Sequence, residues 1–72
     1  MNSPKSKKIR KDLGQKLRTA REQLGLIQAE VAKKADITDN YYAMIERGEA
    51  NPSYEKLQKI LKVLNIKSLD LD

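Results

Sequence analysis

Two adjoining stretches of this chain decide its fold: QAEVAKKAD at residues 28–36 and ITDNYYAMIERG at residues 37–48. The spacing of their apolar residues indicates two short helices joined by a tight turn. Thr38 can begin the second helix, because its hydroxyl can accept a hydrogen bond from a backbone N–H one turn ahead, and Gly48 can end it. A short, capped second helix of this kind is usually presented to a partner. The candidate partner surface is the major groove of DNA.

Length and composition restrict the function. The chain has 72 residues, which corresponds to one domain. It contains no cysteine and no histidine, which removes disulfides, thiolate metal sites and the commonest catalytic base. No apolar run approaches the ~20 residues of a membrane span, and the polar start MNSPKSKK lacks the apolar centre of a signal peptide. We therefore expect a cytoplasmic, non-enzymatic domain with no cofactor, no metal and no evident small-molecule ligand.

The net charge of +5 is concentrated at the start of the chain. Residues 1–11 carry five basic residues and no acidic one, whereas from Asp12 onward ten basic residues stand against ten acidic ones. Because serine and proline interrupt residues 1–8, we expect a flexible basic arm there. Two interpretations stay open: a solubilising tail, or an arm that follows DNA phosphates or enters a groove. The basic residues that would contact DNA are Lys7, Lys8 and Arg10.

The rest of the chain has the apolar spacing of helices, and no stretch alternates with the period of a strand. A first helix that ends at Gly25 is predicted by apolar residues at steps of three and four, namely Ile9, Leu13, Leu17, Ala20 and Leu24. Further helices are expected over about residues 28–35, between Thr38 and Gly48, and over about 54–64. The predicted fold class is all-α.

The stretch from Leu13 to Ile66 resembles the phage repressor/Cro-like helix-turn-helix family, often called XRE-type. The matching positions are Leu17-Arg18, Arg21, Gly25-Leu26, Gln28, Val31-Ala32, Ile37-Thr38, Tyr41, Ile45-Glu46-Arg47-Gly48 and Pro52-Ser53. The resemblance implies a compact, lambda-repressor-like DNA-binding domain of four to five helices over residues 9–72. Its helix-turn-helix unit would span about residues 28–47. A fifth helix would begin at Ser68-Leu69-Asp70-Leu71 but have at most one turn.

The resemblance also assigns DNA-binding roles. Gln28, at the start of the second helix, would hold a phosphate, and Tyr41 and Arg47 would flank the reading positions at the backbone. The full set of expected DNA-binding residues outside the arm is Gln28, Lys33, Thr38, Asp39, Asn40, Tyr41, Ala43, Met44 and Arg47. Those that would face base edges are Asp39, Asn40, Ala43 and Met44.

The four reading positions differ in their chemistry. An asparagine pairs bidentately with adenine, so Asn40 is suited to base contact, although a merely solvent-exposed side chain is the alternative. Met44 would meet a thymine methyl or lie partly in the core. Asp39 would accept from cytosine N4, or act only as a first-turn partner of the helix dipole that points away from DNA.

Arg21 and Glu46 are expected to form an ion pair in this family. Such a pair would tie the first helix to the third and set the tilt of the recognition helix. Removing one partner of a buried pair typically costs about 3–5 kcal/mol, so the pair would matter for orientation. The alternative is two separately solvated charges.

Four positions depart from the family pattern, and one of them is Ala43, which replaces a common serine. Ile27 stands where threonine or serine is usual and cannot cap the second helix, which leaves that end to Glu30 or water. Asp36 replaces the turn glycine and must adopt a left-handed conformation, which aspartate tolerates better than most residues. Tyr42 replaces a common isoleucine, so its ring must fit a small core while its hydroxyl reaches water or a partner.

Two functions from different classes follow. The first is a sequence-specific DNA-binding transcriptional regulator. Its partner would be double-stranded DNA, with a homodimer expected on a pseudo-palindromic operator. The second is a helix-turn-helix domain used as a protein–protein interaction module of the coactivator or scaffold type. The near-neutral body after Asp12 supports the second, because DNA-facing surfaces are usually more basic.

Overall fold

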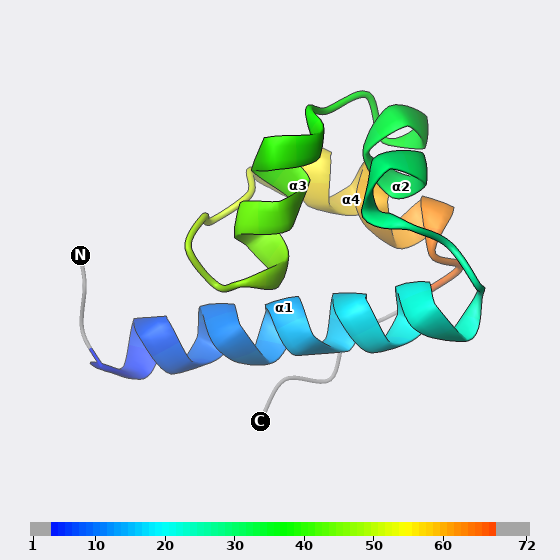
Figure 1. The fold of residues 1–72 in the computed structure, drawn as a ribbon. Coiled ribbons are helices and arrows are strands. Elements are labelled where there is room, and N and C mark those ends of the chain that lie inside the picture. The colour runs from blue at the N-terminus through cyan, green and yellow to red at the C-terminus, as the bar shows by residue number, and fades with distance from the viewer. Residues whose placement is uncertain (1–3, 68–72) are drawn as a thin grey trace.

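The computed structural model describes residues 4–67, and within this range the chain is all-helical, as predicted. The helices are α1 (Pro4–Gln23), α2 (Gln28–Lys34), α3 (Asp39–Glu46) and α4 (Tyr54–Val63). The long α1 lies along one side of the molecule, and the three shorter helices lie together on the other side (Figure 1). No helix in the described part is long and apolar enough to cross a membrane. The fifth helix expected from Ser68 lies outside the described residues.

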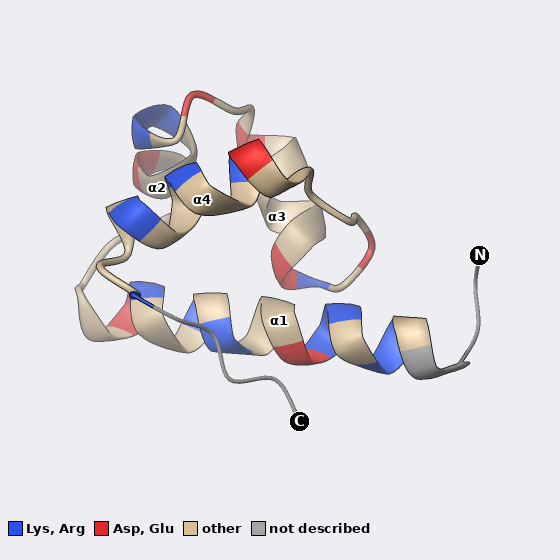
Figure 2. Cartoon of the chain, turned by 180° about the vertical axis from the view of Figure 1, so that it is seen from behind, with Lys and Arg blue, Asp and Glu red and all other residues tan. Residues whose placement is uncertain are grey.

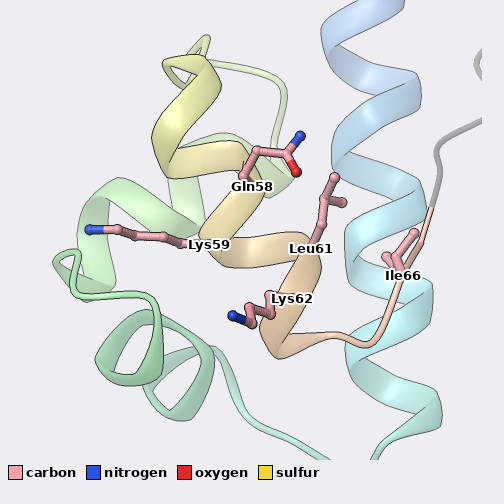
Figure 3. Close-up of a pocket in the computed structure, with 5 residues that line it drawn as sticks. All are labelled: Gln58, Lys59, Leu61, Lys62 and Ile66. Atoms are coloured by element: carbon pink, nitrogen blue, oxygen red, sulfur yellow. The ribbon is translucent and has the colours of Figure 1, made fainter.

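A single core lies between α1 and the three shorter helices. The buried apolar side chains are Leu13, Leu17, Val31, Ala32, Ala35, Tyr42, Ile45, Ile60, Leu61 and Leu64. Leu61 points from α4 toward α1, and Ile66 lies beside α1 just beyond the end of α4 (Figure 3). Two residues of the predicted α1 stripe lie outside this core, because Ile9 is 47% and Leu24 is 48% exposed. They lie near the two ends of α1, which is longer than the body packed against its middle.

The start of α1 differs from the sequence prediction. A flexible arm was expected through residue 8, but the helix already begins at Pro4 and carries Lys7, Lys8 and Arg10 on its surface. Proline is well suited to a first helical turn, and lysine and arginine are good helix formers. The Lys8 ammonium also lies 3.0 Å from the Asp12 carboxylate one turn later, which supports the helix locally.

The turns around α2 follow the sequence reasoning. Gly25 adopts φ of +70°, and the Leu26 N–H donates back to the Arg21 carbonyl at 3.1 Å, which closes α1. Ile27 has no capping side chain, and its N–H donates instead to Glu30 Oε1 at 2.9 Å. After α2, Asp36 takes the left-handed conformation with φ of +60°, as expected for its position.

Gly14 sets the distance between α1 and α3. A Cβ atom at Gly14 would lie 2.2 Å from the Glu46 carbonyl oxygen and 2.7 Å from that of Ile45. The backbones of the two helices therefore touch at this point, which only glycine permits. Just beyond, Gly48 packs against Lys11 of the same helix. The C-terminal end of α3 is thus held against α1, and its N-terminal end projects away from it (Figure 1).

Candidate nucleic-acid interface

The N-terminal half of α3 forms an exposed surface. The Thr38 hydroxyl accepts a hydrogen bond from the Tyr41 N–H at 3.1 Å, which defines where the helix begins. Asp39 and Asn40 are exposed, and Met44 is half-buried. The Asn40 amide lies 3.7 Å from the Met44 sulfur, one turn away on the same face. Because sulfur is a weak acceptor, the amide can leave it for a base edge at little cost.

The opposite face of α3 anchors the helix in the core. Tyr42 and Ile45 are fully buried there, and Glu46 is 9% exposed. Ala43 is half-buried at the border between the two faces, and Tyr41 packs partly against the core. Met44 therefore lies partly in the core, and the rest of its side chain remains accessible.

The Arg21–Glu46 ion pair expected from the resemblance is present. The Arg21 Nε donates to Glu46 Oε2 at 2.7 Å and its Nη2 donates to Oε1 at 3.1 Å, a two-point contact between α1 and α3. The remaining Nη1 donates to the Leu26 carbonyl at 2.9 Å, which adds the α1–α2 turn to the tie. The two side chains are only 13% and 3% exposed, so water competes little with the pair.

The electrostatics of this cluster favour the charged form of both partners. Burial by itself would raise the pKa of Glu46, but the Arg21 guanidinium, the Tyr42 hydroxyl and the Gln28 amide outweigh it and keep that pKa below its ordinary value. The hydrogen bond to Glu46 likewise raises the pKa of Arg21. The buried carboxylate is therefore ionised at neutral pH, and α3 is held by a full ion pair.

Gln28 and Tyr42 complete the surroundings of Glu46. The Gln28 amide donates to Glu46 Oε1 at 3.0 Å, so the residue expected at a phosphate already uses one of its N–H groups inside the protein. The Tyr42 hydroxyl is buried beside the Glu46 carboxylate, although it makes no hydrogen bond of ordinary geometry with a described residue. Burial raises the pKa of Tyr42 far above its ordinary value.

The other predicted DNA-binding residues are more widely spread. Arg47 is exposed at the end of α3 and pairs with Glu49 at 3.0 Å. Lys33 is exposed in the last turn of α2. The basic residues Lys7, Lys8 and Arg10 lie on α1, and Figure 2 shows Lys and Arg positions along this helix with acidic positions between them. Since α1 meets the far end of α3, they do not adjoin the reading positions near Thr38.

The sequence analysis assigned no role to three residues that shape the surroundings of α3. Gly14 brings α1 and α3 together, and its signal was a glycine inside a helical apolar pattern. Gln15 and Arg18 join Arg21, Gln28, Glu46 and Arg47 around a cavity of about 320 Å³. A different cavity, of about 500 Å³, lies along α4 and is lined by Gln58, Lys59, Leu61, Lys62 and Ile66 (Figure 3). It contains none of the predicted site residues.

Known proteins share both the sequence and the fold. A sequence profile described as "Helix-turn-helix" matches residues 17–71. The chain is 35% identical over 54 residues to the immunity repressor protein of Bacillus phage phi105, an alignment that covers 75% of this chain and 38% of that protein. It is 34% identical over 55 residues to the HTH-type transcriptional regulator SinR of Bacillus subtilis, covering 75% of this chain and 50% of SinR. The chain thus spans half or less of the length of these curated relatives.

Solved structures of other regulators have a similar fold. The restriction-modification controller protein C.AhdI of Aeromonas hydrophila superposes with a TM-score of 0.78 at 31% identity, covering 81% of this chain and 88% of that one. The clp gene regulator ClgR of Corynebacterium glutamicum superposes with a TM-score of 0.77 at 29% identity, covering 82% of this chain and 77% of that one. Together with the profile match and the capped, outward-facing α3, they show that this chain belongs to the XRE-type helix-turn-helix family.

Proposed function

We propose that this chain is the sequence-specific DNA-binding domain of a transcriptional regulator, which inserts the N-terminal half of α3 into the major groove. The observation that carries the proposal is the outer face of α3, where Asp39 and Asn40 are exposed and Met44 is partly accessible, on a helix fixed by a capping threonine and a buried ion pair. A fixed helix is needed because base readout requires side chains held in register with base edges. The family includes the repressors and regulators described above, which supports this assignment.

On this proposal the residues divide into two groups. Asn40 and Met44 read bases, Asn40 through its amide and Met44 through contact with a thymine methyl. Gln28, Lys33 and Arg47 contact phosphates and set the register without reading sequence. Two copies of the chain would place their α3 helices in successive major grooves about 34 Å apart, on a pseudo-palindromic site in the cytoplasm.

Duplex binding at two salt concentrations tests the proposal. Affinity for a labelled mixed-sequence duplex should fall steeply between about 50 and 200 mM salt, because bound phosphates release counterions. Arg47→Ala should weaken binding to all sequences alike, whereas Asn40→Ala should change which sequences are preferred in a selection from a random pool. Circular dichroism of each variant controls for folding, since both side chains are exposed.

The basic side chains of α1 need a separate test by substitution. Removing residues 1–11 would cut into α1 and take away Lys11, which packs against Gly48. Lys7→Gln together with Lys8→Gln removes charge and leaves the helix intact. If α1 follows phosphates, the double variant binds every duplex more weakly and with a shallower salt dependence.

A protein-binding module is the second candidate, and the balanced charge of the chain after Asp12 favours it. The two candidates separate at low salt. If the intact protein binds no duplex at about 50 mM salt, where electrostatic binding is strong, the DNA-binding proposal is wrong and the module remains.

A further inference from the structure

A cavity of about 320 Å³ opens where α1, the start of α2 and the end of α3 meet. Its lining consists of Gln15, Arg18, Arg21, Gln28, Glu46 and Arg47. Three guanidinium groups and two side-chain amides outweigh the single carboxylate. Arginine is the side chain best suited to phosphate, because its planar fork matches two phosphate oxygens. The cavity is therefore suited to an anion.

The three arginines differ in how freely they can meet an incoming anion. Arg21 donates to the Glu46 carboxylate and to the Leu26 carbonyl, so it is committed to the fold. Arg18 pairs with Glu22 at 3.3 Å, and both side chains are more than half exposed. Arg47 pairs with Glu49 at 3.0 Å, and these two are also more than half exposed. Water and ions reach both outer pairs.

We propose that Glu49 and Glu22 are internal competitors of the DNA backbone. Each neutralises one arginine at the rim of the cavity, Arg47 or Arg18, until a phosphate displaces it. This inference rests on the proposed function and adds a regulation of the same surface: the protein lowers its own affinity for phosphate. A phosphate and a carboxylate both accept two parallel N–H bonds from a guanidinium, so one can replace the other without rearranging the fold.

The expected size of the effect is modest. Exposed ion pairs typically change an equilibrium constant by about 1.4- to fivefold, so a phosphate displaces either acid readily. The displaced carboxylate stays nearby, since Glu49 follows Arg47 by two residues and Glu22 follows Arg18 by four, and it repels the bound backbone. Neutralising either acid therefore frees an arginine and removes a repulsive charge.

The first experiment measures fluorescence anisotropy of a labelled mixed-sequence duplex with the wild-type chain, Glu49→Gln and Glu22→Gln. At about 50 mM salt, each variant should bind about two- to fivefold more tightly than the wild type. The gain should shrink at about 200 mM salt, because surface charges are then screened. Glu55→Gln is the matched control: it removes the same charge from α4, outside the cavity lining, and should change affinity less than either variant.

A double-mutant cycle separates competition from a general change of charge. In an Arg47→Gln background there is no guanidinium for Glu49 to hold, so Glu49→Gln should give a clearly smaller gain, the part that comes from removing a repulsive charge. A gain of the same size in that background would overturn the inference, because the acid would then act only by long-range repulsion. The same cycle applies to Glu22→Gln in an Arg18→Gln background.

The outcomes distinguish this inference from the proposed function. If the wild type binds duplex with a steep salt dependence but neither acid variant binds more tightly, the competition is wrong and DNA binding stands. If the wild type binds no duplex at about 50 mM salt, the proposed function itself is wrong, and the competition with it.

Discussion

Replacing Gly14 with alanine should destabilise this protein, although a glycine-to-alanine change in the middle of an exposed helix normally stabilises a protein. Alanine in place of glycine within a helix normally adds about 0.5–1 kcal/mol to the free energy of unfolding, because it reduces the conformational freedom of the unfolded chain. At Gly14 the added Cβ would lie 2.2 Å from the Glu46 carbonyl oxygen. That distance would have to grow by about 1 Å or more to reach ordinary contact.

The cost follows from what surrounds the new atom. Its nearest neighbours are backbone atoms of Ile45 and Glu46, which cannot rotate away as a side chain would. Forcing extra atoms into a packed contact typically costs about 1–3 kcal/mol, and rigid neighbours place Gly14→Ala at the upper end. After subtraction of the helix-forming gain, the net loss is about 2 kcal/mol, or a fall in Tm of about 8–16 °C for a domain of this size.

Urea and thermal unfolding followed by circular dichroism measure this loss. Lys16→Ala, an exposed position on the same helix, is the control and should stay within about 0.5 kcal/mol of the wild type. DNA affinity should fall together with stability, because separating α1 from α3 strains the Arg21–Glu46 pair. A Gly14→Ala variant that unfolds at the same urea concentration as the wild type, or a higher one, would refute the close approach of the two helices.

Three further changes test the cluster around Glu46. Tyr42→Phe should change the free energy of unfolding by less than about 1 kcal/mol. The hydroxyl it removes is buried without a hydrogen bond of ordinary geometry, but it lies beside the Glu46 carboxylate, so the two effects offset each other. A loss of about 2 kcal/mol or more in urea would show that the hydroxyl makes a full hydrogen bond. Arg21→Ala should lower the free energy of unfolding by about 3–5 kcal/mol, since it leaves the buried Glu46 carboxylate uncompensated. Arg21→Met combined with Glu46→Leu should recover most of that stability. A loss below about 1 kcal/mol in the single variant would contradict the structural role of the ion pair. Stability should also depend on pH. Burial raises the pKa of Glu46, but Arg21, Tyr42 and Gln28 more than reverse this, so the folded pKa lies below the unfolded one. The stabilisation from Glu46 is then complete above the ordinary glutamate pKa of about 4.3 and is lost as pH falls through the folded pKa. In urea titrations across that range, Glu46→Gln should therefore lose less stability than the wild type. Equal losses in the two proteins would contradict the lowered pKa of Glu46.

Several elements could be predicted from local residues alone. Thr38 caps α3, Gly25 and Asp36 take left-handed conformations, and Glu30 replaces the missing cap at Ile27. Each of these depends on interactions within a few residues of the chain, so the local sequence contains the information needed. The core positions of α3 were predictable for the same reason, because helical periodicity places Tyr42 and Ile45 on one face.

Two predictions from the sequence were wrong: where α1 begins, and how far its apolar stripe is buried. Residues 4–8 contain serine and proline, which favoured an arm, yet the helical preference of lysine and the Lys8–Asp12 pair extend α1 to Pro4. Ile9 and Leu24 fit the apolar stripe of α1 but lie 47% and 48% exposed, because burial depends on how far the packed body reaches along the helix. A periodic pattern gives the face of a helix and not the length of its contact.

Local residues already specify the number and order of the helices in the described region, the caps of α3 and α4, and the outer face of α3, because these depend on neighbours along the chain. Long-range packing is needed to bring Gly14 against the backbone of Glu46, to bury the Tyr42 hydroxyl beside Glu46, and to place Arg18 and Arg47 at one cavity. These features depend on the distance and angle between α1 and α3. That geometry results from the packing of all the core side chains together, and no local pattern contains it.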